Sequence, residues 1–143
     1  MSIRLGLQIP NFSYGTGVSE LFPTVIAQAQ EADAAGFDSV FVMDHFYQLP
    51  MLGTPDQPML EAYTALGALA AVTKHVQLGT MVTGNSYSNP TLLAKAITTL
   101  DVISQASAMA NIVPDGACAR AEMPDRYTVS PAQSDGPAGG SST

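Results

Sequence analysis

Asp44 and His45 are the two residues of this chain whose types and placement best suit chemistry. They directly follow the short apolar run 40–43, which the pattern predicts as a buried strand. An imidazole at the carboxyl end of a parallel strand lies where α/β folds bind their ligands, and it exchanges protons near neutral pH. We therefore take His45 as a candidate catalytic residue, with Asp44 beside it. The alternative is an ordinary loop in which Asp44 caps a local turn.

Small and hydroxyl-bearing residues at 79–84 form a second candidate, at the end of the third predicted strand. Gly79, Thr80 and Thr83 would let the backbone approach a flat cofactor closely, and the alternative is a plain strand followed by a glycine turn. The sequence contains no complete glycine-rich phosphate motif, no nucleophile elbow and no metal-ligand spacing. We therefore predict no metal site.

Three strand and helix units, all before residue 104, are expected to position these residues. Strands are predicted at 3–9, 40–43 and 76–82, and helices from about 19 to 35, 59 to 73 and 90 to 103. Ser19 is the expected N-cap of the first helix, Pro23 lies in its first turn, and Gly36 follows its end. Asn89 and Pro90 are the expected N-cap and first residue of the third helix. This alternation predicts an α/β fold with a parallel sheet.

The predicted strands carry different residues on their two faces, because side chains alternate along a strand. One face of the first and third strands is aliphatic and suits packing under helices. The other face holds Gly6, Gln8, Gln77, Gly79, Met81 and Thr83. In the second strand the same reasoning turns Phe41, Met43 and His45 away from the helices. Such a face is typical of a barrel interior rather than of a sheet covered by helices on both sides.

The composition narrows the classes of function. The 143 residues include 5 basic and 12 acidic side chains, for a net charge of −7, which disfavours nucleic-acid and anionic-membrane partners. The single cysteine, Cys118, excludes an internal disulfide, and no signal peptide or membrane span is evident, so we expect a cytoplasmic protein. The segment 105–143 is rich in Ala, Ser, Pro and Gly, and we expect it to be irregular or disordered.

Six segments of the chain, taken in order, match motifs of one known family. They are Leu5–Asn11, Ala35–Val40, Val42–Phe46, Leu78–Thr83, Asn89–Pro90 and Thr99–Ser104. Together they resemble the luciferase-like monooxygenase family, and most closely its oxidoreductases that use the deazaflavin coenzyme F420. The resemblance covers about residues 1–104. Ser88 departs from it, because relatives often carry Arg at that position.

The resemblance implies a (β/α)8 barrel in which the ring of coenzyme F420, or alternatively FMN, lies at the carboxyl ends of the strands. Asp44 and His45 would lie beside the ring, with His45 as the proton donor or ring contact. Met81 and Val82 match the position where relatives have a non-prolyl cis peptide that supports the ring. The cofactor-binding residues that the resemblance implies are Asn11, Asp44, His45, Thr80, Met81, Val82 and Thr83.

A barrel of this kind needs roughly 250 residues, so we expect a partial (β/α)8 barrel of about three units at 1–104, with a tail at 105–143. We expect a truncated product with weak or no turnover, whose parent enzyme performs hydride transfer or monooxygenation on a small organic substrate. The first and third strands would be open edges, through which the chain could form a homo-oligomer or bind a separately encoded remainder. The alternative is a non-enzymatic fragment or small binding module that lacks a cofactor.

Overall fold

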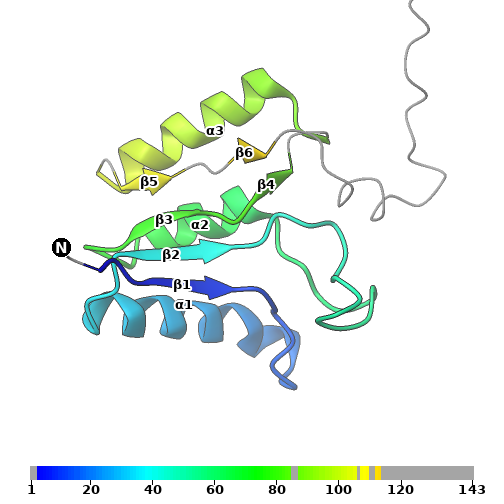
Figure 1. Cartoon of the computed structure of the whole chain (residues 1–143). Coiled ribbons are helices and arrows are strands. Elements are labelled where there is room, and N and C mark those ends of the chain that lie inside the picture. The colour runs from blue at the N-terminus through cyan, green and yellow to red at the C-terminus, as the bar shows by residue number, and fades with distance from the viewer. Residues whose placement is uncertain (1–2, 85–86, 106, 110–111, 114–143) are drawn as a thin grey trace, which may run out of the picture.

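Strands and helices alternate along the chain in the computed structural model, which describes residues 3–84, 87–105, 107–109 and 112–113 (Figure 1). The elements are β1 (Gly6–Ile9), α1 (Val18–Ala34), β2 (Ser39–Val42), α2 (Ala62–Ala70), β3 (Gln77–Thr80), β4 (Thr83–Gly84), α3 (Pro90–Ile103), β5 (Ala108–Met109) and β6 (Ile112–Val113). This order confirms the predicted α/β class. Among the described residues, none of the helices is both long and apolar enough to cross a membrane.

The main sheet is parallel and has the order β1-β2-β3-β5 (Figure 1). The prediction that the third strand is an open edge is wrong, because β5 pairs with β3 through Leu78 and Gly79. The short strands β4 and β6 pair separately. Two pieces of the expected irregular tail, 108–109 and 112–113, are therefore strands, whereas residues 114–143 lie outside the described residues. Within the described part, β1 remains at the edge of the sheet.

One face of the sheet packs against the helices, as the alternation of side chains predicts. The strands and the residue just before β3 contribute Ile9, Val40, Val42, Leu78 and Val76 to the buried cluster. The helices contribute Leu21, Val25, Ala29 and Ala32 of α1, Ala62, Leu66, Leu69 and Ala70 of α2, and Leu100 of α3. On the other face, a Cβ atom at Gly6 would lie 2.8 Å from Ser39 Oγ and 3.2 Å from Phe41. The small and polar residues therefore share one face, opposite the helices.

The first helix begins and ends with backbone features rather than side-chain caps. Its N-cap is Gly17, and Ser19 lies inside the helix, so the predicted cap at Ser19 is wrong. Pro23 consequently lies in the second turn, where it lacks the N–H that would donate to the carbonyl of residue 19. At the other end Gly36 has a φ of 81° and follows the helix as predicted, with Phe37 N–H donating to Ala32 at 3.0 Å.

The other two helices begin with capping side chains. Asn89 Oδ1 accepts the backbone N–H groups of Thr91 and Leu92 at 3.0 and 3.2 Å, which confirms the predicted start of α3. The second helix was expected from Met59, but it begins at Ala62 because the carboxylate of Glu61 caps it. Glutamate is not a favoured N-cap residue, so the preference rules for this position did not indicate it.

Asp33 joins the end of α1 to the start of β3. Its carboxylate accepts backbone hydrogen bonds from Lys74, His75 and Val76 at 2.9, 2.8 and 2.8 Å. Burial of the carboxylate opposes ionisation, but these bonds and the nearby His75 outweigh it and hold the pKa of Asp33 below its ordinary value. The ionised side chain therefore stabilises the connection between helix and sheet.

Replacement of Asp33 by Asn should lower the free energy of unfolding by about 1 kcal/mol at neutral pH, because the charge-assisted bonds are lost. Since the pKa of Asp33 is lowered in the folded state, its stabilising effect is complete above the unfolded pKa of about 3.9 and disappears as the pH falls towards the folded pKa. Urea unfolding of both proteins at neutral and acidic pH measures this difference. Asp101→Asn, at an exposed carboxylate of α3, is the matched control. An equal loss in both variants would contradict the assignment.

Candidate functional site

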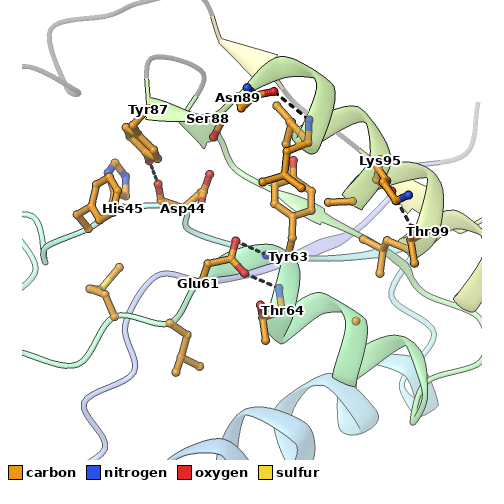
Figure 2. A pocket seen from close by; sticks show the side chains of 18 of the residues that line it. Asp44, His45, Glu61, Tyr63, Thr64, Tyr87, Ser88, Asn89, Lys95 and Thr99 are labelled. Atoms are coloured by element: carbon orange, nitrogen blue, oxygen red, sulfur yellow. Dashed lines mark hydrogen bonds between the residues drawn. The ribbon is translucent and has the colours of Figure 1, made fainter. Parts of the chain in front are cut away.

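The candidate site lies at the carboxyl end of β2, where Asp44 and His45 follow the strand. A cavity of about 770 Å³ begins at these two residues and continues between α2 and α3. Its walls come from 44–46, from 59–67 and from 87–103 (Figure 2). The cavity thus joins the residues that follow β2 to the helices α2 and α3, on the side of the sheet that the helices cover, whereas the sequence predicted that His45 turns away from the helices.

Asp44 connects the end of β2 to the next strand and to α2. Its Oδ2 accepts the backbone N–H of Gly84 at 3.0 Å. Burial raises the pKa of Asp44, and the neighbouring carboxylate of Glu61 raises it further, against the opposing effect of backbone N–H groups at Gly84 and Ala62 and of His45. The carboxylate of Asp44 therefore binds the backbone of the neighbouring strand. We take His45 as the member of the pair that would contact a ligand.

Phe46, the residue after His45, contacts a second aromatic residue, Tyr87. The rings of Phe46 and Tyr87 have centroids 4.5 Å apart and are inclined at 57°. The hydroxyl of Tyr87 donates to the backbone carbonyl of Asp44, and Figure 2 shows this bond beside the imidazole. The segment before α3 is thereby attached to the residues on both sides of His45.

The segment between β3 and β4 is anchored on both sides. The peptide bond between Met81 and Val82 is cis, as the family resemblance implies. The N–H of Met81 donates to the carbonyl of Val42 at 2.9 Å, and its carbonyl accepts a bond from Gln8 Nε2 at 3.4 Å. The Met81 side chain is 39% exposed. Three strands thus contribute to holding a partly exposed apolar residue at the carboxyl end of the sheet.

A chain of hydroxyl groups lies beneath this segment. Thr83 Oγ1 is 2.6 Å from Tyr63 Oη and 2.5 Å from Thr80 Oγ1, and both threonines are buried. The alternation along one continuous strand predicted that Thr83 would share a face with Met81. That prediction is wrong, because β3 ends at Thr80 and the alternation does not carry across to β4. Thr83 and Thr80 lie together and support the backbone from below.

Asn11 has a different neighbourhood from the other predicted site residues. Its side chain accepts the N–H of Ser13 at 2.6 Å and donates to the carbonyl of Leu52 at 3.5 Å. It lines a groove between β1 and α1 rather than the cavity at His45. The structure therefore brings Asp44 and His45 into the cavity, sets the hydroxyls of Thr80 and Thr83 below Met81 and Val82, and places Asn11 where it fastens β1 to the long loop that follows β2.

Three residues of the site were not predicted from the sequence, namely Glu61, Tyr63 and Tyr87. Glu61 caps α2 at the mouth of the cavity, Tyr63 begins the hydroxyl chain, and Tyr87 contacts both neighbours of His45. Of these three, only Tyr87 could have been predicted from the sequence, because it lies two residues before the Asn89 cap and therefore close to the carboxyl edge of the sheet. In the part of the chain described here, no group of three or more His, Cys, Asp or Glu residues is arranged to hold a metal ion.

The model of the luciferase-like monooxygenase family matches residues 3–119 of this chain, beyond residue 104 where we expected the resemblance to end. A comparison with curated proteins gave no match. Among solved structures, the oxygenating constituent of 3,6-diketocamphane monooxygenase from the CAM plasmid of Pseudomonas putida, in complex with FMN, is 23% identical with a TM-score of 0.62. The alignment covers 77% of this chain and 29% of that one.

Two F420-dependent enzymes have a similar likeness. The tetrahydromethanopterin reductase from Methanopyrus kandleri is 23% identical with a TM-score of 0.57, covering 77% of this chain and 26% of its own. An F420-dependent secondary alcohol dehydrogenase, in complex with an F420-acetone adduct, is 23% identical with a TM-score of 0.60, covering 77% and 31%. Likeness at this level shows the fold, a partial (β/α)8 barrel. The chain spans about three-tenths of the length of these structures.

Replacement of Asp44 by Asn should remove a pH-dependent loss of stability. Because burial raises the pKa of Asp44, the side chain favours the folded state most below the unfolded pKa of about 3.9, and this effect is lost as the pH rises through the higher folded pKa. The wild-type protein should therefore lose stability relative to Asp44→Asn as the pH rises from about 4. Thermal unfolding midpoints across this range measure the difference. A constant difference at every pH, or the same trend in Asp101→Asn, would contradict the prediction.

Replacement of Thr83 by Val should lower the free energy of unfolding by about 1–3 kcal/mol, because it removes the two buried hydrogen bonds that Thr83 Oγ1 makes with Thr80 and Tyr63. Chemical denaturation checks the value. Thr98→Val is the matched control, since Thr98 is exposed on α3 and bonds only to carbonyls of its own helix in the contacts described. We expect a change within about 0.5 kcal/mol for that variant. Similar losses of unfolding free energy at Thr83 and Thr98 would show that the hydrogen bonds of the buried hydroxyl groups do not contribute specifically to stability.

Proposed function

Because the chain belongs to the luciferase-like monooxygenase family, we propose that it carries the part of an F420- or FMN-dependent oxidoreductase that meets the coenzyme ring. The parent reaction is hydride transfer or monooxygenation on a small organic substrate. The observation that carries this proposal is the placement of His45 just after the carboxyl end of the parallel strand β2. Ligands of α/β barrels bind at this end.

The residues present fit the flat ring of such a coenzyme. The face of the sheet opposite the helices carries the small residues Gly6 and Gly79, with Ser39 and Phe41 of β2 packed against the position of Gly6. Met81, 39% exposed, offers an apolar surface at the same end of the sheet, with its backbone anchored by Val42 and Gln8. A ring laid on this surface would meet backbone and apolar atoms on one side and His45 at its edge.

The chain's own residues have distinct tasks in this proposal. When bound, the reduced coenzyme supplies the hydride for the substrate or the electrons for oxygenation. His45 holds or delivers a proton at an imidazole nitrogen next to the ring, a task that imidazole side chains perform in general acid–base catalysis. Asp44 orients the end of β2 through Gly84. Thr80 and Thr83 keep the Met81–Val82 segment in position from below.

Several contacts of the parent enzyme must come from elsewhere, since the chain spans about three-tenths of the length of its structural neighbours. The open edge of β1 within the described part is the natural place for another strand to join. We propose that either a second copy of the chain or a separate polypeptide completes the barrel, and that the chain alone turns over weakly or not at all. The alternative of a binding module without coenzyme is an outcome of the test below.

Titration of the full chain with reduced and oxidised F420, and separately with FMN, tests the proposal by the change in coenzyme emission. We expect one of the two to bind, and we expect His45→Gln to weaken that binding about tenfold, as the loss of one hydrogen bond of good strength does. His75→Gln is the matched control, because His75 lies at the opposite end of β3, next to the Asp33 bond. A folded chain that binds neither coenzyme would be evidence for the non-enzymatic alternative.

A further inference from the structure

Tyr87 makes contacts that connect it with the residue before His45 and the residue after it. Its hydroxyl donates to the backbone carbonyl of Asp44, which belongs to the peptide unit leading into His45. Its ring packs against Phe46, with centroids 4.5 Å apart. Figure 2 shows Tyr87 beside the imidazole with its hydroxyl directed at Asp44. A single side chain thus fixes the backbone on both sides of the candidate catalytic group.

Gly84 makes this contact possible. A Cβ atom at Gly84 would overlap the phenol ring of Tyr87, so the absence of a side chain leaves the space that the ring occupies. The N–H of Gly84 donates to Asp44 Oδ2 at 3.0 Å, and its carbonyl accepts the hydroxyl of Ser88 at 2.8 Å. Gly84 therefore joins the same cluster through its backbone, and the segment leading into α3 is held from two directions.

The geometry points to Tyr87 as a positioning residue that fixes His45 at the mouth of the cavity through the Asp44 carbonyl and the Phe46 ring. This inference rests on the proposed function in taking His45 as the reacting group. Tyr87 also lines the cavity itself, so the positioning effect must be read from the ring signals of His45 as well as from ligand binding. Ser88 has the complementary task of closing the short turn from Gly84 to the Asn89 cap of α3.

The two histidines of the chain provide a direct readout. His45 is at the carboxyl end of β2, and His75 precedes β3 at the opposite end of the sheet, where its backbone is bonded to Asp33. The ring signals of both can be followed in a ¹H–¹³C correlation spectrum of the whole protein without any coenzyme. Tyr87→Phe removes the hydroxyl and keeps the ring, and it leaves the charged neighbours Asp44 and Glu61 in place. Tyr14→Phe is the matched control, because the Tyr14 hydroxyl donates to Gln28 at 3.0 Å beside α1.

We expect Tyr87→Phe to move the ring signals of His45 and to leave those of His75 unchanged, and we expect Tyr14→Phe to move neither. Phe46→Leu, which removes the other contact, should move the same His45 signals and serves as the measurement if Tyr87→Phe does not fold. A role of Tyr87 in general stability alone would shift both histidines together or neither. Unchanged His45 signals in folded Tyr87→Phe and Phe46→Leu, or equal shifts at His75, would overturn the inference.

Coenzyme titration separates this inference from the proposed function. Tyr87→Phe should weaken binding of whichever coenzyme the wild-type chain binds by about five- to tenfold, the range expected for one hydrogen bond. If the wild-type chain binds neither F420 nor FMN, the proposed function fails, while the His45 spectrum still decides whether Tyr87 positions that residue. If the coenzyme binds and Tyr87→Phe binds it equally well with unchanged His45 signals, Tyr87 has no positioning role.

Discussion

The hydrogen bond between the N–H of Gly84 and the carboxylate of Asp44 is the contact on which the arrangement of the site depends. It joins the end of β2 to β4, and with Tyr87 it sets the distance between the loop after β2 and the segment that begins α3. The contact is opposed by burial, which raises the pKa of Asp44 and so works against its ionised form. The ionised carboxylate of Asp44 is therefore disfavoured by burial at the same position where it joins the backbone of β4 to the end of β2.

The opposite end of the sheet shows the contrasting use of a carboxylate. Asp33 receives three backbone N–H groups, and the result is a pKa below the ordinary value. The difference between the two aspartates follows from their surroundings, since three backbone N–H groups favour the ionised form of Asp33, whereas burial, and after it the carboxylate of Glu61, disfavours the ionised form of Asp44. The carboxylate at the amino end of the strands is thus favoured in its ionised form, whereas the one at the carboxyl end is not. This division is typical of barrel enzymes, in which function and stability occupy opposite faces.

Features that depend on local backbone chemistry were predictable from the sequence. Asn89 and Pro90 mark the start of α3 and Gly36 follows the end of α1, because each residue type satisfies a backbone requirement by itself. The separation of strand faces was also predictable, since it needs only the alternation of side chains. The cap at Glu61 and the hydroxyl chain from Tyr63 to Thr80 were not, because these contacts join residues brought together by the fold.

Two predictions, the face of Thr83 and the absence of a neighbour for the third strand, failed because side-chain patterns do not determine where backbone pairing begins and ends. Residues 81 and 82 interrupt the strand, so Thr83 returns to the helix side instead of continuing the alternation with Met81. Residues 108–109 form too short a run to be recognised as a strand, yet their backbone pairs with β3 because parallel pairing needs only peptide groups in register. Side-chain patterns therefore predict which face a regular strand buries, but they say little about where a strand stops or which short segment extends a sheet. The end of β3 at the Met81–Val82 segment and the pairing of β5 are positions of this kind. The position of His45 after a strand could therefore be inferred from the sequence, but the residues that fix His45 could be found only in the structure.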